Sequence, residues 1–328
     1  MKPILISGIR PTEALHLGNY LGALKNFVEL QNSEKYNCLF FIADYHAITT
    51  NFKGTETKKL TNRIIELGKD YLAVGLNPKK SILFIQSLVP EHLELGWIIQ
   101  CLSPFGQLTR MTQFKQKAKE SVQVNAGLFA YPSLMAADIL LYNAKYVPVG
   151  KDQLQHLEFV RDIAQKFNSE FGKTFNLPEP VLTTAPKILS LTDPSSKMSK
   201  SQAEGCLFLK DSKSEIYRKI KSAVTDSGRE IKYDSKTKPG ISNLLTIYSA
   251  LSGKPISSLE EEFKGKGYAE FKLELSKLIN NSFKPYRQNR KKITNQKVLK
   301  IFKTGSIQAR KIATKRLNQI KAKIGLKL

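Results

Sequence analysis

Short apolar runs alternate with longer helical patterns over the first half of the chain. Four runs are apolar throughout, which is typical of strands covered by helices on both faces: 3–8, 38–44, 81–86 and 146–150. Apolar residues at helical spacing occupy the stretches between and after these runs: 15–30, 56–74, 91–101, 106–119, 129–143 and 151–171. The alternation predicts an α/β fold with a Rossmann-like, doubly wound parallel sheet, whose ligands bind at the carboxyl ends of the strands.

The pattern changes in the second half of the chain. Residues 191–205, LTDPSSKMSKSQAEG, are rich in serine, proline and lysine and show little periodicity, so this stretch is predicted to be an exposed loop. Beyond Ser212 the pattern is almost wholly helical. A chain of 328 residues is long enough for about two domains. We place them at 1–201 and 202–328, with the last helix able to pack back on the first domain.

The charge of the chain is strongly positive and unevenly distributed. Lys and Arg number 52 against 28 Asp and Glu, a net charge of +24, and 16 of these cations lie between 275 and 328 with no acid among them. Such a segment is suited to polyanions: nucleic acid, an anionic membrane surface or phosphate-rich ligands. Because 41% of the residues are hydrophobic, the composition excludes a wholly disordered or collagen-like chain.

Targeting and cysteine patterns indicate a cytoplasmic protein. The opening MKPILISGIRP has too short an apolar stretch for a signal peptide, and no apolar run approaches the roughly 18 residues of a membrane helix. Cys38, Cys101 and Cys206 lie far apart, so neither a disulfide framework nor a four-ligand zinc site is expected. We expect no metal site in the protein and no membrane partner.

The turn after the first predicted strand carries a first candidate site. In SGIRPTEALHLGNY, residues 7–20, His16 and Asn19 offer donors at the start of a helix, where backbone N–H groups and the helix dipole favour phosphate. Gly18 has no side chain, so a flat base can approach the backbone there. Taken alone, HLGN also fits an ordinary amphipathic helix start with a capping histidine.

A second candidate site lies about 180 residues later, where Lys197 and Lys200 belong to the sequence KMSKS. Two mobile ammonium groups in a loop can close over a polyphosphate and neutralise the charge on a leaving pyrophosphate. A solvated basic loop would account for the lysines. It would not account for the partner motif HLGN.

A third group of candidates lies on the predicted helix 129–143. Tyr131, Met135, Asp138 and Tyr142 recur at helical spacing, which places an aromatic ring, a thioether and a carboxylate on one face. In isolation this is also the pattern of a core helix with Asp138 as a cap or ion pair. Just after the next strand, VPVGKDQ offers a carboxylate and an amide that can hold ribose hydroxyls and an ammonium group.

The two motifs, in this order, resemble the signatures of the class I aminoacyl-tRNA synthetases, and the chain is most similar to the bacterial tryptophanyl-tRNA synthetases. The similarity covers nearly the whole chain in ordered blocks: SGIRPT, LHLGNYLGAL, ADYHAIT, RMTQFKQK, GLFAYPSLMAADILLYNAKYVPVG, DQLQHLEFVRDIAQKFN, LTDPSSKMSKS, SAVTDS and KPGISNLL. So many ordered blocks identify a family far more specifically than either motif does alone.

The resemblance implies a reaction and its partners. L-Tryptophan is activated with ATP, which carries Mg²⁺ on its phosphates, and is then transferred to tRNA(Trp). The enzyme is expected to be a homodimer whose all-helical second domain binds the anticodon, with one tRNA spanning both subunits.

The resemblance also implies site residues. Catalytic roles fall to His16, Asn19, Lys197 and Lys200. The residues implied for ATP are Arg10, Pro11, Thr12, Gly18, Asn19, Gly150, Lys151, Asp152, Ile188, Lys197, Met198, Ser199, Lys200 and Ser201. Those implied for tryptophan are Ile6, His46, Tyr131, Met135, Asp138, Val147, Val149 and Gln153, with Asp138 as the acceptor of the indole N–H. Those implied for pyrophosphate or tRNA are Gln113, Lys115 and Lys117.

The chain departs from the family pattern at four single residues and in the QAEG segment after KMSKS, which replaces a more acidic, proline-containing one. Ile6 replaces a common aromatic residue, Arg10 a glutamine, Glu13 a glycine and Lys151 an acid. Glu13 and Lys151 are oppositely charged, and we hypothesise that they pair. Two alternatives stay open: a tyrosyl-tRNA synthetase, which shares the architecture and both signatures, and a non-catalytic paralogue that binds RNA or tryptophan for regulation. The spacing of Met135 and Asp138 favours tryptophan.

Overall fold

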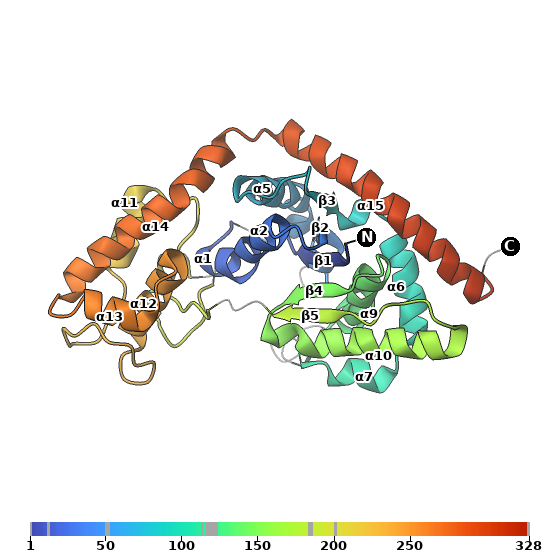
Figure 1. The fold of residues 1–328 in the computed structure, drawn as a ribbon, viewed down its shortest axis with the longest axis horizontal. Coiled ribbons are helices and arrows are strands. Elements are labelled where there is room, and N and C mark those ends of the chain that lie inside the picture. The colour runs from blue at the N-terminus through green and yellow to red at the C-terminus, as the bar shows by residue number, and fades with distance from the viewer. Residues whose placement is uncertain are drawn as a thin grey trace.

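The described part of the chain forms an open, five-stranded parallel sheet with helices on both faces (Figure 1). The computed structural model describes residues 2–11, 14–49, 53–112, 114–115, 124–182, 186–199 and 202–326. Its strands are β1 (Ile4–Ile9), β2 (Asn37–Ile42), β3 (Ser81–Ile85), β4 (Tyr146–Val149) and β5 (Glu179–Leu182), in the order β3-β2-β1-β4-β5. The order reverses between β1 and β4, which is where open α/β sheets bind their ligands.

The helices follow the strands in the order that a doubly wound fold requires. In the first part of the chain they are α1 (Leu17–Asn19), a π-helical turn (Tyr20–Leu24), α2 (Lys25–Asn32), α3 (Asp44–Ala47), α4 (Gly54–Thr57), α5 (Leu60–Ala73), α6 (Glu91–Leu102), α7 (Phe105–Arg110), α9 (Ala126–Leu140) and α10 (Leu154–Phe171). In the last part they are α11 (Lys213–Lys221), α12 (Pro239–Ser252), α13 (Ile256–Glu262), α14 (Tyr268–Lys291) and α15 (Asn295–Lys323). Short 3-10 turns cover Gln86–Leu88, Lys151–Gln153 and Ala203–Gly205.

The predicted parallel sheet and its first four strands are confirmed, and one strand was missed. β5 contains Pro180 and follows Pro178, and no strand was predicted between residues 171 and 191. β5 lies at the edge of the sheet and pairs only with β4, so it needs ladder hydrogen bonds on one side only and tolerates a proline. The predicted single helix 15–30 is divided by the π-helical turn at Tyr20–Leu24.

Two apolar clusters, one on each face of the sheet, form the core of the described residues. Alternate residues of β2 belong to different clusters: Phe40 and Ile42 to one, Leu39 and Phe41 to the other. The first cluster runs without a break into the C-terminal helices, for example at Phe271. A strand that is apolar on both faces is therefore explained by helices packed on both faces.

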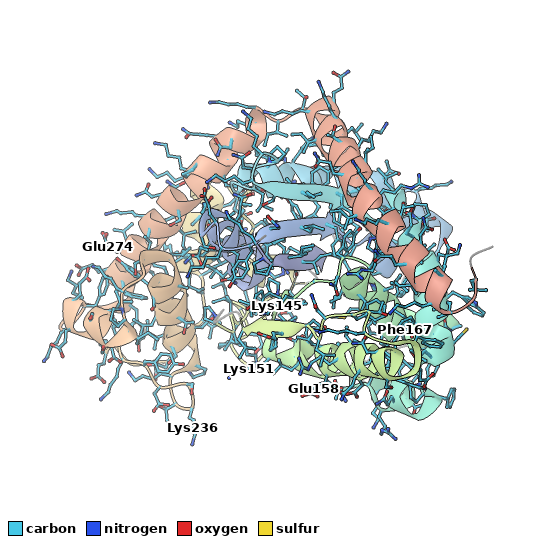
Figure 2. The ribbon with its side chains drawn as sticks, turned by 45° about the vertical axis from the view of Figure 1, so that its right-hand side comes forward. Lys145, Lys151, Glu158, Phe167, Lys236 and Glu274 are labelled. Carbon is cyan, nitrogen blue, oxygen red and sulfur yellow. The ribbon has the colours of Figure 1, made fainter. Side chains whose placement is uncertain are left out.

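The helices expose charge and bury apolar residues. On α10, Glu158 is exposed whereas Phe167 is 2% exposed, and Figure 2 shows both residues on that helix. Within the described residues, no helix offers the length of uninterrupted apolar sequence that a bilayer crossing needs.

The last helix, α15, lies against the β3 edge of the sheet rather than among α11 to α13 (Figure 1). Ser306 accepts a hydrogen bond from the backbone N–H of Ile85 through its Oγ at 3.2 Å, so the outer edge of β3 is partly satisfied by this helix. A Cβ at Gly305 would overlap the carbonyl oxygen of Leu83, so only glycine allows this approach. The division of the chain at residue 202 stays a prediction.

The junction between α14 and α15 is fixed to α5 by ion pairs. Arg290 donates from Nε to Asp70 at 2.7 Å and from Nη2 to Glu66 at 2.6 Å, and the Tyr286 hydroxyl donates to the same Asp70 oxygen at 2.7 Å. Burial opposes the charge on Glu66, but hydrogen bonds from Lys69, Lys210 and Arg290 outweigh it and lower the pKa of Glu66 to about 2.

Gly305→Ala should destabilise the protein. The added methyl group must displace either α15 or the β3 backbone, and overpacking of this kind costs about 3 kcal/mol. Chemical denaturation would measure the free energy of unfolding. The matched control is Ile307→Ala on the same helix, where the side chain is 72% exposed and the expected change is within about 0.5 kcal/mol. Equal stability of the two variants would contradict close packing of α15 on β3.

Candidate active site

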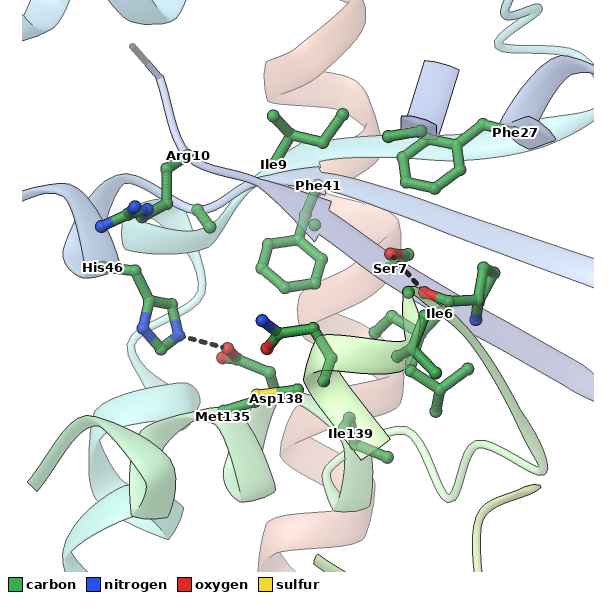
Figure 3. Close-up of a pocket in the computed structure, with 18 of the residues that line it drawn as sticks. Ile6, Ser7, Ile9, Arg10, Phe27, Phe41, His46, Met135, Asp138 and Ile139 are labelled. Carbon is green, nitrogen blue, oxygen red and sulfur yellow. Dashed lines mark hydrogen bonds and ion pairs between the residues drawn. The ribbon is translucent and has the colours of Figure 1, made fainter. Parts of the chain in front are cut away.

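A cavity of about 380 Å³ opens at the carboxyl ends of β1 and β4, where the strand order reverses. Its wall is largely apolar, with Ile6 from β1, Phe41 from β2 and Val147 from β4. The polar groups enter from the helices: His46 from α3 and Asp138 from α9, which point toward each other in Figure 3. An apolar pocket with a few convergent polar groups at this point of the sheet is the expected form of a binding site.

The residues that the sequence assigned to an amino acid converge on this cavity. All of them line it: Ile6, His46, Tyr131, Met135, Asp138, Val147, Val149 and Gln153. Arg10 and Gly150, assigned to ATP, line it as well. Phe41 and Gly8 also line it. A Cβ at Gly8 would overlap the Phe41 ring, so glycine permits the close approach of β1 and β2 at the cavity.

Asp138 is a buried group of the cavity wall that accepts several side-chain hydrogen bonds. It is 2% exposed, and its carboxylate accepts hydrogen bonds from His46 Nε2 at 2.8 Å, Gln86 Nε2 at 2.7 Å and His92 Nδ1 at 2.6 Å. Burial alone would raise the pKa of Asp138, but the hydrogen bonds from His46 and His92 outweigh it and lower that pKa. The carboxylate is therefore an acceptor at neutral pH.

Gln86 and His92 were missed by the sequence analysis. Gln86 directly follows β3, and the carboxyl ends of parallel strands meet at one edge of a sheet, so its position was a usable signal. His92 lies in the first turn of α6, and nothing in the local sequence distinguishes it from a buried core histidine. Both are 0% exposed.

Arg10 and Tyr131 bring an ionic and a phenolic group to the cavity. The Tyr131 hydroxyl lies 2.6 Å from Nε2 of His156. Burial raises the pKa of Tyr131 to about 12 although the charge of Arg10 acts against it, so the phenol stays protonated at neutral pH. Burial likewise lowers the pKa of Arg10. Among the described residues, no carboxylate lies within ion-pairing distance of the Arg10 guanidinium.

The HLGN segment is paired with the chain that follows KMSKS. The backbone N–H of Leu17 donates to the carbonyl of Leu207 at 2.8 Å, and that of Leu209 donates to Leu15 at 3.1 Å. His16 caps α1, with Nδ1 accepting from the backbone N–H of Asn19 at 3.3 Å. The two motifs are therefore brought together through backbone pairing.

Neither His16 nor Lys197 lines the 380 Å³ cavity. Asn19 lines a neighbouring cavity of about 290 Å³, together with Lys59, Arg63 and Lys210. The Oδ1 of Asn19 is buried and has no hydrogen-bond partner in the described part of the chain. Asn19 of HLGN thus lines a second cavity, which also contains the carboxylates of Glu66 and Asp70.

The KMSKS segment begins as a tight antiparallel turn. Met198 N–H donates to Ile188 at 3.0 Å, and Asn243 on α12 bonds both the N–H and the carbonyl of Leu189, at 2.9 and 3.0 Å. Ile188 and Met198, both assigned to ATP, are each 2% exposed and belong to the apolar core, whereas Lys197 is exposed. Of the motif residues that the structure describes, Lys197 is therefore the exposed one. Ser199 is half-buried.

The turn after β4 keeps its predicted polar groups near the cavity mouth. Asp152 accepts from Nε2 of Gln153 at 2.7 Å, and a Cβ at Gly150 would lie 2.7 Å from Oδ1 of Asp152. Lys151 is exposed, Pro11 is buried and Gly18 is half-buried. Lys115 is exposed and does not line this cavity.

Several predicted residues lie outside the described residues: Thr12, Gln113, Lys117, Lys200 and Ser201. Glu13 does too, so its pairing with Lys151 stays a hypothesis.

Comparison with known proteins shows the family to which this chain belongs. The sequence profile of the tRNA synthetases class I (W and Y) matches residues 1–284. The tryptophan–tRNA ligase of Caldanaerobacter subterraneus subsp. tengcongensis is 48% identical over 325 residues, which covers 98% of each chain. The chain belongs to the class I tRNA synthetases.

Solved structures of this family have the same architecture. The tryptophanyl-tRNA synthetase of Mycoplasma pneumoniae superimposes with a TM-score of 0.89 at 37% identity, over 100% of this chain and 99% of that one. That of Campylobacter jejuni, solved with ADP and tryptophan, gives 0.81 at 35% identity, over 98% and 99%. The Rossmann-like fold of this synthetase is thereby confirmed.

Over the residues that the structure describes, no group of three or more His, Cys, Asp or Glu lies close enough to hold a metal ion.

Asp138→Asn should destabilise the synthetase by about 2–4 kcal/mol, because an amide N–H₂ would then face donors in a buried site. The free energy of unfolding at pH 7 would measure the loss. Asp152→Asn, at an exposed position, is the matched control and should change stability by less than about 0.5 kcal/mol. Equal stability of both variants would show that the donors around Asp138 do not depend on its charge.

Proposed function

We propose that this synthetase is a tryptophan–tRNA ligase, which activates L-tryptophan with ATP and transfers it to tRNA(Trp). The observation that carries the proposal is a buried carboxylate, Asp138, in the wall of a largely apolar cavity. An indole N–H donates a hydrogen bond and cannot accept one, so its selective site needs a buried acceptor. The bacterial relatives that match nearly the full length of this chain carry the same name.

The amino acid is oriented by the two ends of the cavity. Ile6, Met135, Val147 and Val149 supply apolar contacts to the indole ring, and Asp138 accepts its N–H. His46, Tyr131 and Gln153 are the polar groups left for the ammonium and carboxylate end. This arrangement turns the carboxylate of tryptophan toward the β1 and β4 ends, where the nucleotide is expected.

The first chemical step forms the adenylate. A carboxylate oxygen of tryptophan attacks the α-phosphorus of ATP, an O–P bond forms, and the bond to pyrophosphate breaks. In the second step the terminal ribose hydroxyl of the tRNA attacks the carbonyl carbon, and AMP leaves. Such steps need positioning and charge neutralisation more than covalent help from the protein.

The phosphate-handling residues are His16, Asn19, Lys197 and Lys200. The pairing of HLGN with the segment after KMSKS supports this role. Arg10, Gly150 and Asp152 serve the α-phosphate and ribose at the cavity mouth. Mg²⁺ binds through the phosphates of ATP.

The tRNA is bound by the basic helical part, 202–328, which carries the anticodon site. The enzyme acts in the cytoplasm. Single-stranded anticodon bases suit recognition by side chains, and phosphates suit a cationic surface. Lys297, Lys300, Lys303, Lys311 and Lys315 on α15 are exposed and make no ion pair with described carboxylates. This cationic surface supports binding of a polyanion as large as tRNA.

The synthetase is proposed to pair with a second copy of itself. α6 exposes Leu93 (45%) and Trp97 (66%) one turn apart, and Phe105 on α7 is 72% exposed. Large exposed apolar side chains are characteristic of protein interfaces. One tRNA then spans both subunits.

Tryptophan-dependent exchange of labelled pyrophosphate into ATP tests the proposed reaction. The wild type should exchange with tryptophan and at least about 10³-fold less efficiently with tyrosine, as expected for sites built around one buried hydrogen bond. His16→Ala and Lys200→Ala should each lower kcat by about 10²-fold, because each removes one transition-state contact. Lys236→Ala, at an exposed lysine on the far helical part, is the control and should retain full exchange.

Two results would redirect this assignment. Exchange with tyrosine but not tryptophan would identify a tyrosyl-tRNA synthetase. Binding of tRNA without exchange for any amino acid would identify a regulatory paralogue.

Sedimentation of the purified protein tests the proposed pairing. The wild type should sediment as a dimer and Trp97→Glu as a monomer, because a buried unpaired charge costs more than a dimer interface tolerates. Tyr217→Glu on α11, where the side chain is 44% exposed, is the control and should remain dimeric. A dimeric Trp97→Glu variant would rule out this face as the contact.

A further inference from the structure

Asp138 is held from three elements at once, and two of its partners do not reach the cavity. Within the described residues, Oδ1 accepts from Gln86 Nε2 and His92 Nδ1, and Oδ2 accepts from His46 Nε2. His46 and Asp138 line the cavity, whereas Gln86 and His92 do not. Oδ1 is therefore turned into the protein and Oδ2 toward the ligand.

We propose that Gln86 and His92 are positioning residues that determine specificity: they lock the Asp138 carboxylate so that it presents one acceptor site and no donor to the cavity. The inference rests on the proposed use of Asp138 for the indole N–H. It goes further in assigning the selectivity to residues that do not touch the amino acid.

The amide of Gln86 can point only one way. Its Oε1 accepts the backbone N–H of Tyr45 at 3.2 Å, so Nε2 is left to donate to Asp138. Gln86 is fully buried, so reversing the amide would break both bonds with no water to replace them. Gln86, at the end of β3, thus fixes one of the two hydrogen bonds that Oδ1 of Asp138 accepts.

His92 is fixed by a second hydrogen bond on its far side. A carboxylate only accepts, so Nδ1 must carry the proton that it donates to Asp138. In the neutral ring, Nε2 then accepts from the Tyr142 hydroxyl at 2.9 Å. Burial, together with the negative charge of Asp138, raises the pKa of Tyr142, so this hydroxyl keeps its proton. In the hydrogen-bonded series of Tyr142, His92 and Asp138, Tyr142 therefore donates to His92 and His92 donates to Asp138.

The acceptor sites of the carboxylate can be counted. An ionised carboxylate has about four of them, two on each oxygen. In the part of the chain that the structure describes, Gln86 and His92 fill both sites on Oδ1, and His46 fills one on Oδ2. One site on Oδ2 is left for the ligand.

This arrangement prefers a group that donates without accepting. In the described residues, the donors that reach Asp138 come from His46, Gln86 and His92 and are committed to it. A phenolic oxygen placed here would give its proton to Asp138 but receive none from these three groups. An indole N–H has no lone pair to satisfy. Leaving a buried acceptor unpaired disfavours the wrong ligand by about tenfold or more.

The test compares tryptophan with β-(benzothien-3-yl)alanine, in which sulfur replaces the indole N–H. The KM for tryptophan in pyrophosphate exchange and the inhibition constant of the analogue give a selectivity ratio. His92→Leu and Gln86→Met keep the side-chain size but remove the donor. His92→Asn is the matched control, because its Nδ2 lies where Nδ1 of the histidine was.

The ratio should fall at least about tenfold in His92→Leu and in Gln86→Met, since a carboxylate free to rotate forms a weaker bond with the indole. It should stay within about twofold of wild type in His92→Asn, and the KM for ATP should be unchanged in all three variants. Damage to folding alone would weaken both ligands and ATP together and leave the ratio unchanged. If His92→Leu does not fold, Gln86→Met makes the same comparison.

An unchanged ratio in a variant that still exchanges would overturn the positioning role and leave the proposed function intact. Absence of tryptophan-dependent exchange in the wild type would overturn the proposed function itself.

Discussion

The buried charge of Asp138 is the constraint on which the cavity depends. An ionised carboxylate out of contact with water is stable only when its acceptor sites are filled. Here the donors come from α3, the end of β3 and α6. Each of these elements must be packed correctly before the charge is satisfied, so the ligand cavity and the core around it form as one unit.

The sheet topology determines where the cavity beside Asp138 lies. Because β1 and β4 diverge at the point where the strand order reverses, their ends leave room for a ligand beside α9. The HLGN segment starts from the end of β1, and backbone pairing of residues 15–17 with 207–209 brings the KMSKS region to the same side of the sheet. The cavity beside Asp138 and the two motifs proposed to handle phosphate are thus built from one edge of a single sheet.

Much of this arrangement follows from local sequence. The apolar runs predicted four of the strands, since a strand covered on both faces must be apolar on both. Helical spacing predicted that Met135 and Asp138 share a face, and both line the cavity. The residues assigned to tryptophan came one by one from the family resemblance, and they line one cavity, but their role stays a proposal.

Other features depend on contacts between distant parts of the chain. Gln86 and His92 could not be recognised from their own segments. The carboxylate to which they donate, Asp138 on α9, lies 46 to 52 residues away in sequence. Ile188 and Met198 were assigned to a ligand, yet packing against the C-terminal helices buries both side chains. β5 was missed because its proline is tolerated only at a sheet edge, and edge position is a property of the completed fold.

The packing of α15 on β3 has a consequence for synthesis on the ribosome. β3 leaves the exit tunnel more than 200 residues before the helix that covers its edge. Until Gly305 and Ser306 emerge, the nascent chain carries an uncovered strand edge, which is the kind of surface that pairs wrongly with other chains. Chaperone binding to ribosome-bound chains should therefore persist until the final helix has been released.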